Sequence, residues 1–143
     1  MKIEQSKYQS FKWTGSKWLI AKDIIPLLPT KGKTYFEPFL GGGAILINAI
    51  PYFRKSVAGD IYEPLINLWE LIKRNPKEID IKYRSLWNKL EDEVSNIVLD
   101  RDRGKGLPKV YYQTRENFNK NKDPFSLLFL TKTCLNGVIR FSS

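Results

Sequence analysis

A run of three glycines behind an acid and a proline constrains this chain more than any other stretch. An apolar segment ends at Glu37, Pro38 removes a backbone donor, and Gly41-Gly42-Gly43 precede the apolar run 44–47. This order predicts a strand, a tight turn and a helix, because glycine permits the positive φ that a short corner needs. The N–H groups at the start of that helix would face any ligand bound at the turn.

The glycine turn does not match the two common phosphate-binding patterns. A phosphate loop continues with Gly-Lys-Ser/Thr, whereas Ala44-Ile45 follows here, and a dinucleotide fingerprint spaces its glycines apart. The carboxylate of Glu37 would also repel a pyrophosphate. A ligand that carries positive charge fits better, and a turn that binds nothing remains the alternative.

A second acid follows at a spacing that suits a neighbouring strand. Asp60 ends the short segment Ser56-Val57-Ala58-Gly59-Asp60, 23 residues after Glu37. In a β-α-β unit this spacing places Asp60 at the tip of the next strand, where a ribose hydroxyl would lie. We therefore expect both carboxylates to face one hollow. The alternative for Asp60 is to cap the helix that begins near Glu63-Pro64.

Aromatic residues and lysines surround a small turn near the N-terminus, Lys12-Trp13-Thr14-Gly15-Ser16-Lys17. Trp13 and Lys17 suit an aromatic wall and a cation beside a planar ligand that carries a carboxylate. Packing in the core is the alternative for Trp13, because tryptophan usually buries its apolar side. Ser16 is a candidate cap for the next helix. We expect that helix to bury an apolar face made of Leu19, Ile20, Ile24, Leu27 and Leu28.

The charge of the chain favours a polyanionic partner. Its 143 residues include 24 Lys and Arg against 15 Asp and Glu, a net charge of +9. Such an excess indicates nucleic acid first and a membrane surface second. We expect no membrane association, since no apolar run reaches spanning length and no signal peptide opens the chain. A single Cys suits the reducing cytoplasm. The absence of His excludes a His-based triad and leaves too few ligands for structural zinc.

The remainder of the chain is predominantly helical. Apolar residues recur at spacings of three and four over 65–72 and 79–98. Shorter helices are expected over 110–119 and over 124–137. The basic, glycine-containing segment 101–109 is either a solvated connector or a contact for a phosphate backbone.

Five blocks of residues stand in one order along the chain. They are Lys12-Trp13-Thr14-Gly15-Ser16-Lys17; Glu37-Pro38-Phe39-Leu40-Gly41-Gly42-Gly43; Asp60; Tyr111-Tyr112 with Arg115, Phe118 and Asn119; and the helix at Phe129-Leu130 that leads to Asn136-Gly137 and Arg140. Together the blocks resemble the D12 class of DNA adenine-N6 methyltransferases, the Dam family. Each block alone is modest evidence, whereas all five in order are specific.

The resemblance implies an α/β fold, an incomplete Rossmann-like S-adenosylmethionine-dependent methyltransferase domain with a mainly helical target-recognition region. Residues 1–62 would form the first part of the cofactor-binding domain, and residues 63–143 the region that binds duplex DNA. The implied cofactor-binding positions are Trp13, Lys17, Glu37, Pro38, Phe39, Gly41, Gly43 and Asp60. The implied DNA-binding positions are Lys12, Arg115, Asn136, Val138 and Arg140. The sulfonium and ammonium of S-adenosylmethionine agree with a site that carries two carboxylates.

The catalytic Asp-Pro-Pro-Tyr segment of the family has no counterpart in this sequence. The chain contains no Pro-Pro pair, and its one Asp-Pro, Asp123-Pro124, precedes the recognition turn. In the family, an Asp oxygen and a backbone carbonyl of that segment would draw on the adenine amino hydrogens, and its Tyr would stack on a flipped base. The resemblance therefore implies an enzyme that methylates N6 of adenine at specific sites, of which this chain alone is catalytically silent.

Three alternatives stay open at this point. The chain can be a non-catalytic DNA-binding remnant, one half of a split enzyme completed by a second chain, or part of a methyltransferase that acts on RNA. The helices after Asp60 argue weakly against RNA. Because only two or three strands are expected, we also predict an uncovered sheet edge, an exposed apolar face, and marginal stability or self-association.

Overall fold

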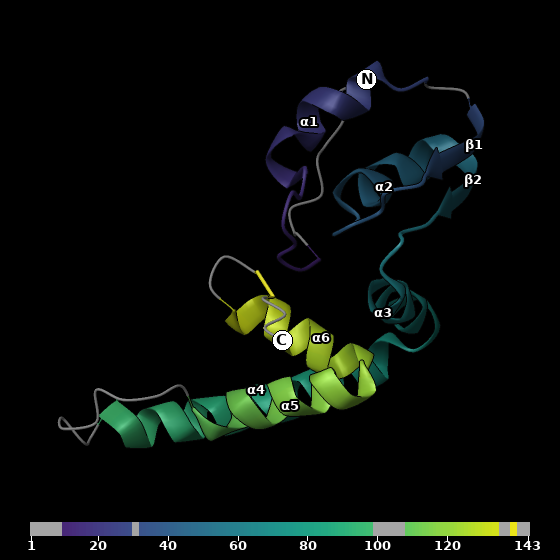
Figure 1. Ribbon diagram of the computed structural model, residues 1–143. Coiled ribbons are helices and arrows are strands. Elements are labelled where there is room, and N and C mark those ends of the chain that lie inside the picture. The colour runs from purple at the N-terminus through teal and green to yellow at the C-terminus, as the bar shows by residue number, and fades with distance from the viewer. Residues whose placement is uncertain (1–9, 30–31, 99–107, 135–137, 140–143) are drawn as a thin grey trace. The chain divides into compact units, whose positions relative to one another are not determined.

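A computed structural model describes residues 10–29, 32–98, 108–134 and 138–139 (Figure 1). Two compact units make up the chain, Met1–Glu63 and Pro64–Ser143. This boundary lies one residue beyond the boundary after residue 62 that the sequence predicts. No helix within the described ranges combines the length and the apolar character needed to cross a bilayer.

The first unit is built on a β-α-β arrangement. β1 (Gly32–Glu37) and β2 (Phe53–Ala58) pair in parallel over their full length, so their carboxyl ends lie together. Between them the chain forms α2 (Ala44–Ala49) and the 3-10 helix η3 (Ile50–Tyr52), and α2 packs beside the strands (Figure 1). The predicted order of strand, turn and helix is therefore confirmed.

The structure defines the limits of both strands. The apolar segment that predicts the first strand ends at Glu37, and β1 extends from there back to Gly32. The second strand is predicted over Ser56–Asp60, yet β2 begins at Phe53 and ends at Ala58. Gly32 and Phe53 are partners in the register, and a Cβ on Gly32 would collide with the Phe53 ring. Glycine thus lets the two strands begin side by side.

The predicted apolar face of the first helix is wrong at three positions. Leu19, Ile20 and Leu27 are exposed, whereas Ala21 and Ile25 are buried with Ile45 and Ala49. Ile24 and Leu28 pack against this core as expected. The reason is that no continuous α-helix forms here. The segment consists of η1 (Trp18–Ile20), α1 (Ala21–Ile24) and η2 (Ile25–Leu27), and the 3-10 turns η1 and η2 rotate its side chains out of the α-helical period.

Four helices make up the rest of the described chain. They are α3 (Glu63–Arg74), α4 (Pro76–Val98), α5 (Lys109–Asn121) and α6 (Pro124–Thr133). Helices were predicted in all four places. The last one is shorter than expected, because Cys134 is already extended, with φ −68° and ψ 148°.

Polar side chains fix the starts of two of these helices. The Glu78 N–H donates to Asn75 Oδ1 at 3.3 Å and Asn75 Nδ2 donates back to Glu78 Oε2 at 3.0 Å, a reciprocal cap on α4. On α6 the Asp123 carboxylate accepts the Ser126 N–H at 3.0 Å. Pro124 occupies the first turn of α6, where its missing donor costs nothing.

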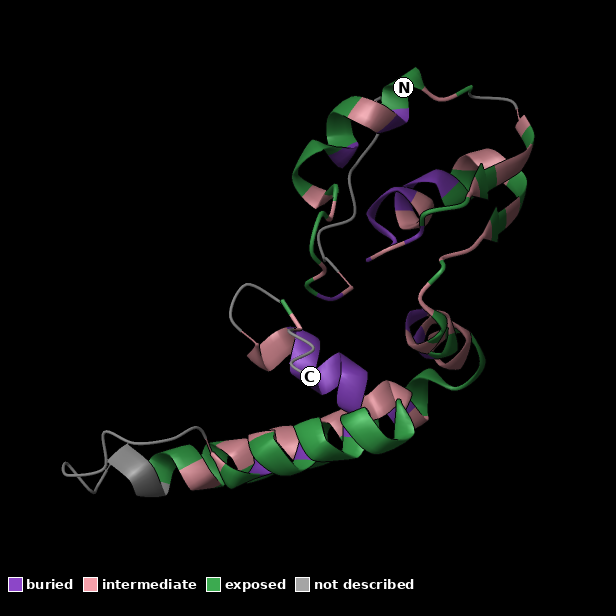
Figure 2. Cartoon of the chain, in the orientation of Figure 1, coloured by how far each residue is buried: buried purple, intermediate pink, exposed green. Residues whose placement is uncertain are grey.

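The core of the second unit runs through α5 and α6. Helix α6 is buried along most of its length, as Figure 2 shows, and it packs against α4 and α5. The buried side chains of α5 recur every four residues, at Val110, Thr114 and Phe118. The backbone N–H of Val110 donates to Glu93 Oε2 of α4 at 3.1 Å, which fastens the start of α5.

Candidate functional site

A cavity of about 330 Å³ lies at the carboxyl ends of the two parallel strands in the first unit. Its volume is at the lower end of the roughly 300–1,000 Å³ that is usual for small-molecule sites. Six of the predicted cofactor positions line it, namely Trp13, Lys17, Glu37, Phe39, Gly41 and Asp60. Both acids thus face one cavity, as the sequence predicts. Pro38, which is exposed, and Gly43, which is buried, do not belong to the lining.

Backbone hydrogen bonds join the tips of the two strands. The Gly59 N–H donates to the Glu37 carbonyl oxygen at 2.9 Å, and the Leu40 N–H donates to the Gly59 carbonyl oxygen at 2.8 Å. The ladder between the strands therefore continues one step past the ends of β1 and β2. This continuation sets Asp60 beside the turn that follows Glu37.

The Asp60 carboxylate accepts two backbone hydrogen bonds. Its Oδ2 accepts the Gly41 N–H at 2.9 Å, and its Oδ1 accepts the Tyr62 N–H at 3.0 Å. The second bond fits the local capping alternative, because Tyr62 directly precedes α3. The first bond was not anticipated, and it fastens the glycine turn to β2. Each carboxylate oxygen has a further lone pair with which it can accept a hydroxyl group of a ligand.

Glu37 is a half-buried carboxyl group with a local donor. The Tyr35 hydroxyl donates to Glu37 Oε2 at 3.1 Å. Burial raises the pKa of the Glu37 carboxyl, and hydrogen bonds from Tyr35 and from the backbone of Leu46 offset only part of this rise. Burial, followed by the negative charge of Glu37, raises the pKa of the Tyr35 hydroxyl far above its ordinary value. A cation in the cavity would relieve the cost of charging Glu37.

The glycine turn is shaped by contact with Trp13. A Cβ on Gly41 would lie 3.2 Å from Trp13 Cδ1, and one on Gly42 would lie 3.1 Å from Trp13 Cβ. Gly41 and Gly43 also have positive φ, 49° and 66°, so this turn suits glycine for two separate reasons. The sequence leaves two roles open for Trp13, packing in the core and lining a site. The structure shows both, because the half-buried indole packs on the glycine turn and also lines the cavity.

Lys17 closes the turn that carries Trp13. Its Nζ donates to the Gly15 carbonyl oxygen at 2.7 Å, and the side chain stays exposed. The Ser16 hydroxyl accepts the Trp18 N–H at 3.4 Å, but the N-cap position of η1 is Lys17 and no side chain caps it, so the predicted capping role of Ser16 is wrong. The Lys17 ammonium, which lines the cavity, has two further N–H donors that it can offer to an anionic group of a ligand.

The predicted DNA-binding positions lie on both units. Lys12 is exposed in the first unit. Arg115 is exposed on α5, with its guanidinium 5.1 Å from the ring of Tyr112. Val138 is exposed, and Asn136 and Arg140 lie outside the described residues. The roles of all five positions stay predictions.

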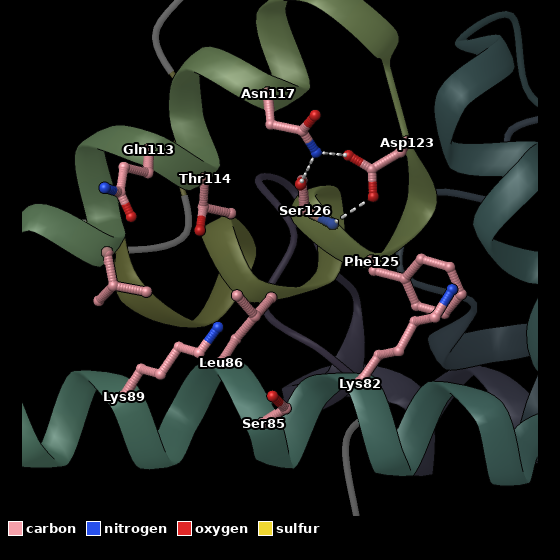
Figure 3. Close-up of a pocket in the computed structure, with 11 residues that line it drawn as sticks. Lys82, Ser85, Leu86, Lys89, Gln113, Thr114, Asn117, Asp123, Phe125 and Ser126 are labelled. Atoms are coloured by element: carbon pink, nitrogen blue, oxygen red, sulfur yellow. Dashed lines mark hydrogen bonds between the residues drawn. The ribbon is translucent and has the colours of Figure 1, made fainter.

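A second cavity, of about 420 Å³, lies among α4, α5 and α6 (Figure 3). Its polar lining includes Lys82, Lys89, Asn117 and Asp123. Asn117 Nδ2 donates to Asp123 Oδ2 at 2.6 Å, and Lys82 already pairs with Glu78 at 2.9 Å. Lysine and amide groups suit phosphate contacts, but this pairing and the Asp123 charge leave the groove little net positive charge. The sequence analysis does not predict this cavity. The only local indication of it in the sequence is the seven-residue spacing of Lys82 and Lys89 on α4.

Comparison with known proteins identifies the family to which this site belongs. The D12 class N6 adenine-specific DNA methyltransferase family matches residues 13–143. The type II methyltransferase M.MjaIII of Methanocaldococcus jannaschii is 34% identical over 143 residues, which cover 90% of this chain and 46% of that protein. DNA adenine methylase of Escherichia coli K12 is 33% identical over 135 residues, covering 92% of this chain and 42% of that protein.

The same enzyme of Haemophilus influenzae is 30% identical over 142 residues, 96% of this chain and 44% of the relative. The chain thus spans less than half the length of these curated relatives. The family match includes the N-terminal turn from Trp13 onward, the glycine turn and Asp60, which build the cavity. The chain belongs to the D12 class of N6 adenine-specific DNA methyltransferases.

Proposed function

We propose that the cavity at the strand tips binds S-adenosylmethionine and that the protein takes part in methylation of N6 of adenine in duplex DNA. The observation that carries this proposal is that Glu37, Asp60 and Trp13 line one cavity at the carboxyl ends of two parallel strands. In open α/β sheets, ligands bind outside these ends. S-adenosylmethionine, when bound, supplies the methyl group.

The residues of the cavity match the chemical groups of this cofactor. Each Asp60 carboxylate oxygen accepts a ribose hydroxyl with its remaining lone pair. Its other lone pair already accepts a backbone N–H, and the bond from Gly41 keeps the glycine turn in place. Glu37 offers negative charge to the sulfonium or ammonium, and a bound cation favours its ionised form. The indole of Trp13 covers a planar ring, and the ammonium of Lys17 reaches the carboxylate.

The basic character of the chain supports duplex DNA as the substrate. The net charge of +9 provides attraction to phosphates that does not depend on sequence, and it weakens steeply as salt rises. We assign Lys12 to phosphate contact, and Arg115, Asn136, Val138 and Arg140 to contacts with bases and phosphates. An arginine can read guanine through two hydrogen bonds in the major groove. The protein would work in the cytoplasm, where its DNA lies and its single Cys stays reduced.

The 143-residue chain alone is silent in methyl transfer under this proposal, because it has no Asp-Pro-Pro-Tyr segment to accept the adenine amino hydrogens. An assay with labelled cofactor and unmethylated duplex DNA tests this point. Turnover by the purified chain would overturn it. Binding of DNA without catalysis is the second candidate function, and the charge of +9 favours it. Duplex RNA as a competitor separates the DNA assignment from an RNA one.

Calorimetric titration of S-adenosylmethionine tests the cofactor site. Removing an aromatic ring that stacks on a base typically costs about 1–3 kcal/mol, so Trp13→Ala should weaken binding by about fivefold or more. Trp87→Ala is the matched control, since Trp87 lies on α4 and stacks on Tyr83 with ring centroids 6.0 Å apart. Equal affinities for the two variants would contradict the assignment, provided that circular dichroism shows both to be folded.

A further inference from the structure

We propose that Tyr35 is a positioning residue of the candidate cofactor site, and that its hydroxyl holds the Glu37 carboxylate in place as a charged acceptor for the cationic end of S-adenosylmethionine. Tyr35 does not touch the ligand and acts only through Glu37. The inference rests on the proposed function, because it names the group that prepares one acid of that site.

The ring of Tyr35 is anchored in the core of the first unit. It packs against the apolar cluster in which Ile25 and Ile45 are buried, and its centroid lies 5.3 Å from that of the Phe53 ring. Tyr35 does not belong to the described lining of the cavity, whereas Glu37 does. Because the packed ring fixes where the hydroxyl lies, this donor is preorganised for the carboxylate.

The geometry of the strand brings the hydroxyl to the carboxylate. Tyr35 and Glu37 are two residues apart on β1, so their side chains leave the same face of the strand. The Tyr35 hydroxyl donates to Glu37 Oε2 at 3.1 Å. A phenylalanine at position 35 would fill the same place in the core but would leave Oε2 without this donor. The hydroxyl is therefore the part of Tyr35 that packing does not explain.

A second donor reaches Glu37 from α2. The backbone N–H of Leu46, in the first turn of α2, bonds to the Glu37 carboxyl group. An ionised carboxylate has about four lone-pair sites, so two donors leave acceptor capacity for a ligand. Of these two donors, the Tyr35 hydroxyl is the one that a side-chain substitution removes.

The hydroxyl lowers the cost of a charge at Glu37. Burial raises the pKa of the Glu37 carboxyl, and the bond from Tyr35 opposes this rise. Burial, followed by the negative charge of Glu37, raises the pKa of the Tyr35 hydroxyl, so Tyr35 stays protonated and remains a donor at neutral pH. The other charged groups that line the cavity are Lys17, in the N-terminal turn, and Asp60, after β2, and α2 carries no titratable side chain.

Titration of the free chain measures this contact without any ligand. The ¹³C chemical shift of the Glu37 carboxyl group, followed against pH, reports its pKa. Loss of one charge-assisted hydrogen bond at a half-buried site should raise this pKa by about one pH unit in Tyr35→Phe. Tyr52→Phe is the matched control, because Tyr52 packs against the same core and lies outside the cavity lining. It should leave the pKa of Glu37 unchanged.

Calorimetric titration of S-adenosylmethionine at several pH values measures the consequence for binding. The affinity of the unaltered chain should fall as pH falls through the pKa of Glu37. In Tyr35→Phe this fall should begin about one pH unit higher, so binding should be about tenfold weaker in acid and nearly equal above both midpoints. Adding Tyr35→Phe to Glu37→Gln should have little further effect, because the hydroxyl acts through the carboxylate.

Each other outcome overturns the proposal. An unchanged Glu37 pKa in Tyr35→Phe, or equal changes in Tyr35→Phe and Tyr52→Phe, means that the hydroxyl does not support the charge. Weakening of binding by one factor at every pH, or to the same extent in the Glu37→Gln background, assigns Tyr35 a packing role. If the unaltered chain binds no S-adenosylmethionine at any pH, the proposed function fails and this inference fails with it. If the chain binds and only the effects of Tyr35→Phe are missing, the inference fails alone.

Discussion

Removal of the Asp60 side chain tests how the candidate site is held together. Asp60→Ala deletes the acceptors of two backbone hydrogen bonds, from Gly41 at 2.9 Å and from Tyr62 at 3.0 Å. A hydrogen bond to a charged group contributes about 1.5–3 kcal/mol to stability. Because Asp60 is only half-buried, the lower end applies to each bond, and the free energy of unfolding should fall by about 3 kcal/mol.

Asp60→Asn gives a graded version of the same test. The amide keeps one oxygen acceptor but presents an NH₂ group to the other backbone N–H, so about half of the loss, roughly 1.5 kcal/mol, is expected. Asp23→Ala is the control, because Asp23 is exposed on α1, and a surface substitution typically changes stability by less than about 0.5 kcal/mol.

Urea unfolding measures the free energies, and amide hydrogen exchange measures the two bonds directly. The N–H groups of Gly41 and Tyr62 should exchange faster in Asp60→Ala than in the unaltered chain. This difference should remain after the exchange rates are corrected for the change in the global free energy of unfolding. Unchanged exchange at both amides, with a free energy of unfolding like that of Asp23→Ala, would refute the conclusion that Asp60 fastens the turn.

Three further predictions concern single side chains. Burial raises the pKa of the Glu37 carboxyl, so its contribution to stability is present at pH values below its ordinary pKa and is lost as pH rises through the raised pKa. Glu37→Gln should therefore unfold at a higher urea concentration than the unaltered chain near pH 7, and at the same concentration in acid. The variant should also bind S-adenosylmethionine more weakly. Gly41→Ala places a Cβ at φ 49°, which costs about 1–2 kcal/mol in thermal unfolding, whereas Gly59→Ala meets open space and should be tolerated. Asp123→Ala removes the cap of α6, and urea unfolding should show a loss of about 1 kcal/mol with faster exchange at the Ser126 amide.

Local sequence patterns predict much of the first unit. The apolar run before Glu37 and the glycines after it specify a strand and a corner within ten residues, and the structure has both. The shared cavity also follows from the sequence, because carboxyl ends of parallel strands meet at one edge. The contact of Trp13 with Gly41 and Gly42 could not be anticipated, since it joins segments far apart in the chain. The bond from Gly41 to Asp60 was hidden for the same reason.

In other parts of the chain the sequence pattern predicts the helices and strands but not how they pack against one another. The apolar residues of 19–28 satisfy a helical period, but 3-10 turns lie on both sides of the short α1, the second of them at Pro26, and Leu19 and Leu27 are exposed. The groove of Figure 3 depends on how three helices pack, and no segment of one helix encodes it. The exposure of Phe36 and Val57 agrees with the exposed apolar face that the small number of expected strands predicts.

The central claim is that a positively charged nucleoside binds between the acids at the two strand tips, and amide chemical shifts measure this most directly. S-adenosylmethionine is titrated into the ¹⁵N-labelled chain, with ATP as the comparison ligand. The account predicts saturable shifts at the Trp13 indole N–H and at the Gly41 and Asp60 amides, and weaker ones with ATP because its phosphates meet two carboxylates. Shifts confined to the groove around Lys89, or equal responses to both ligands, would contradict it.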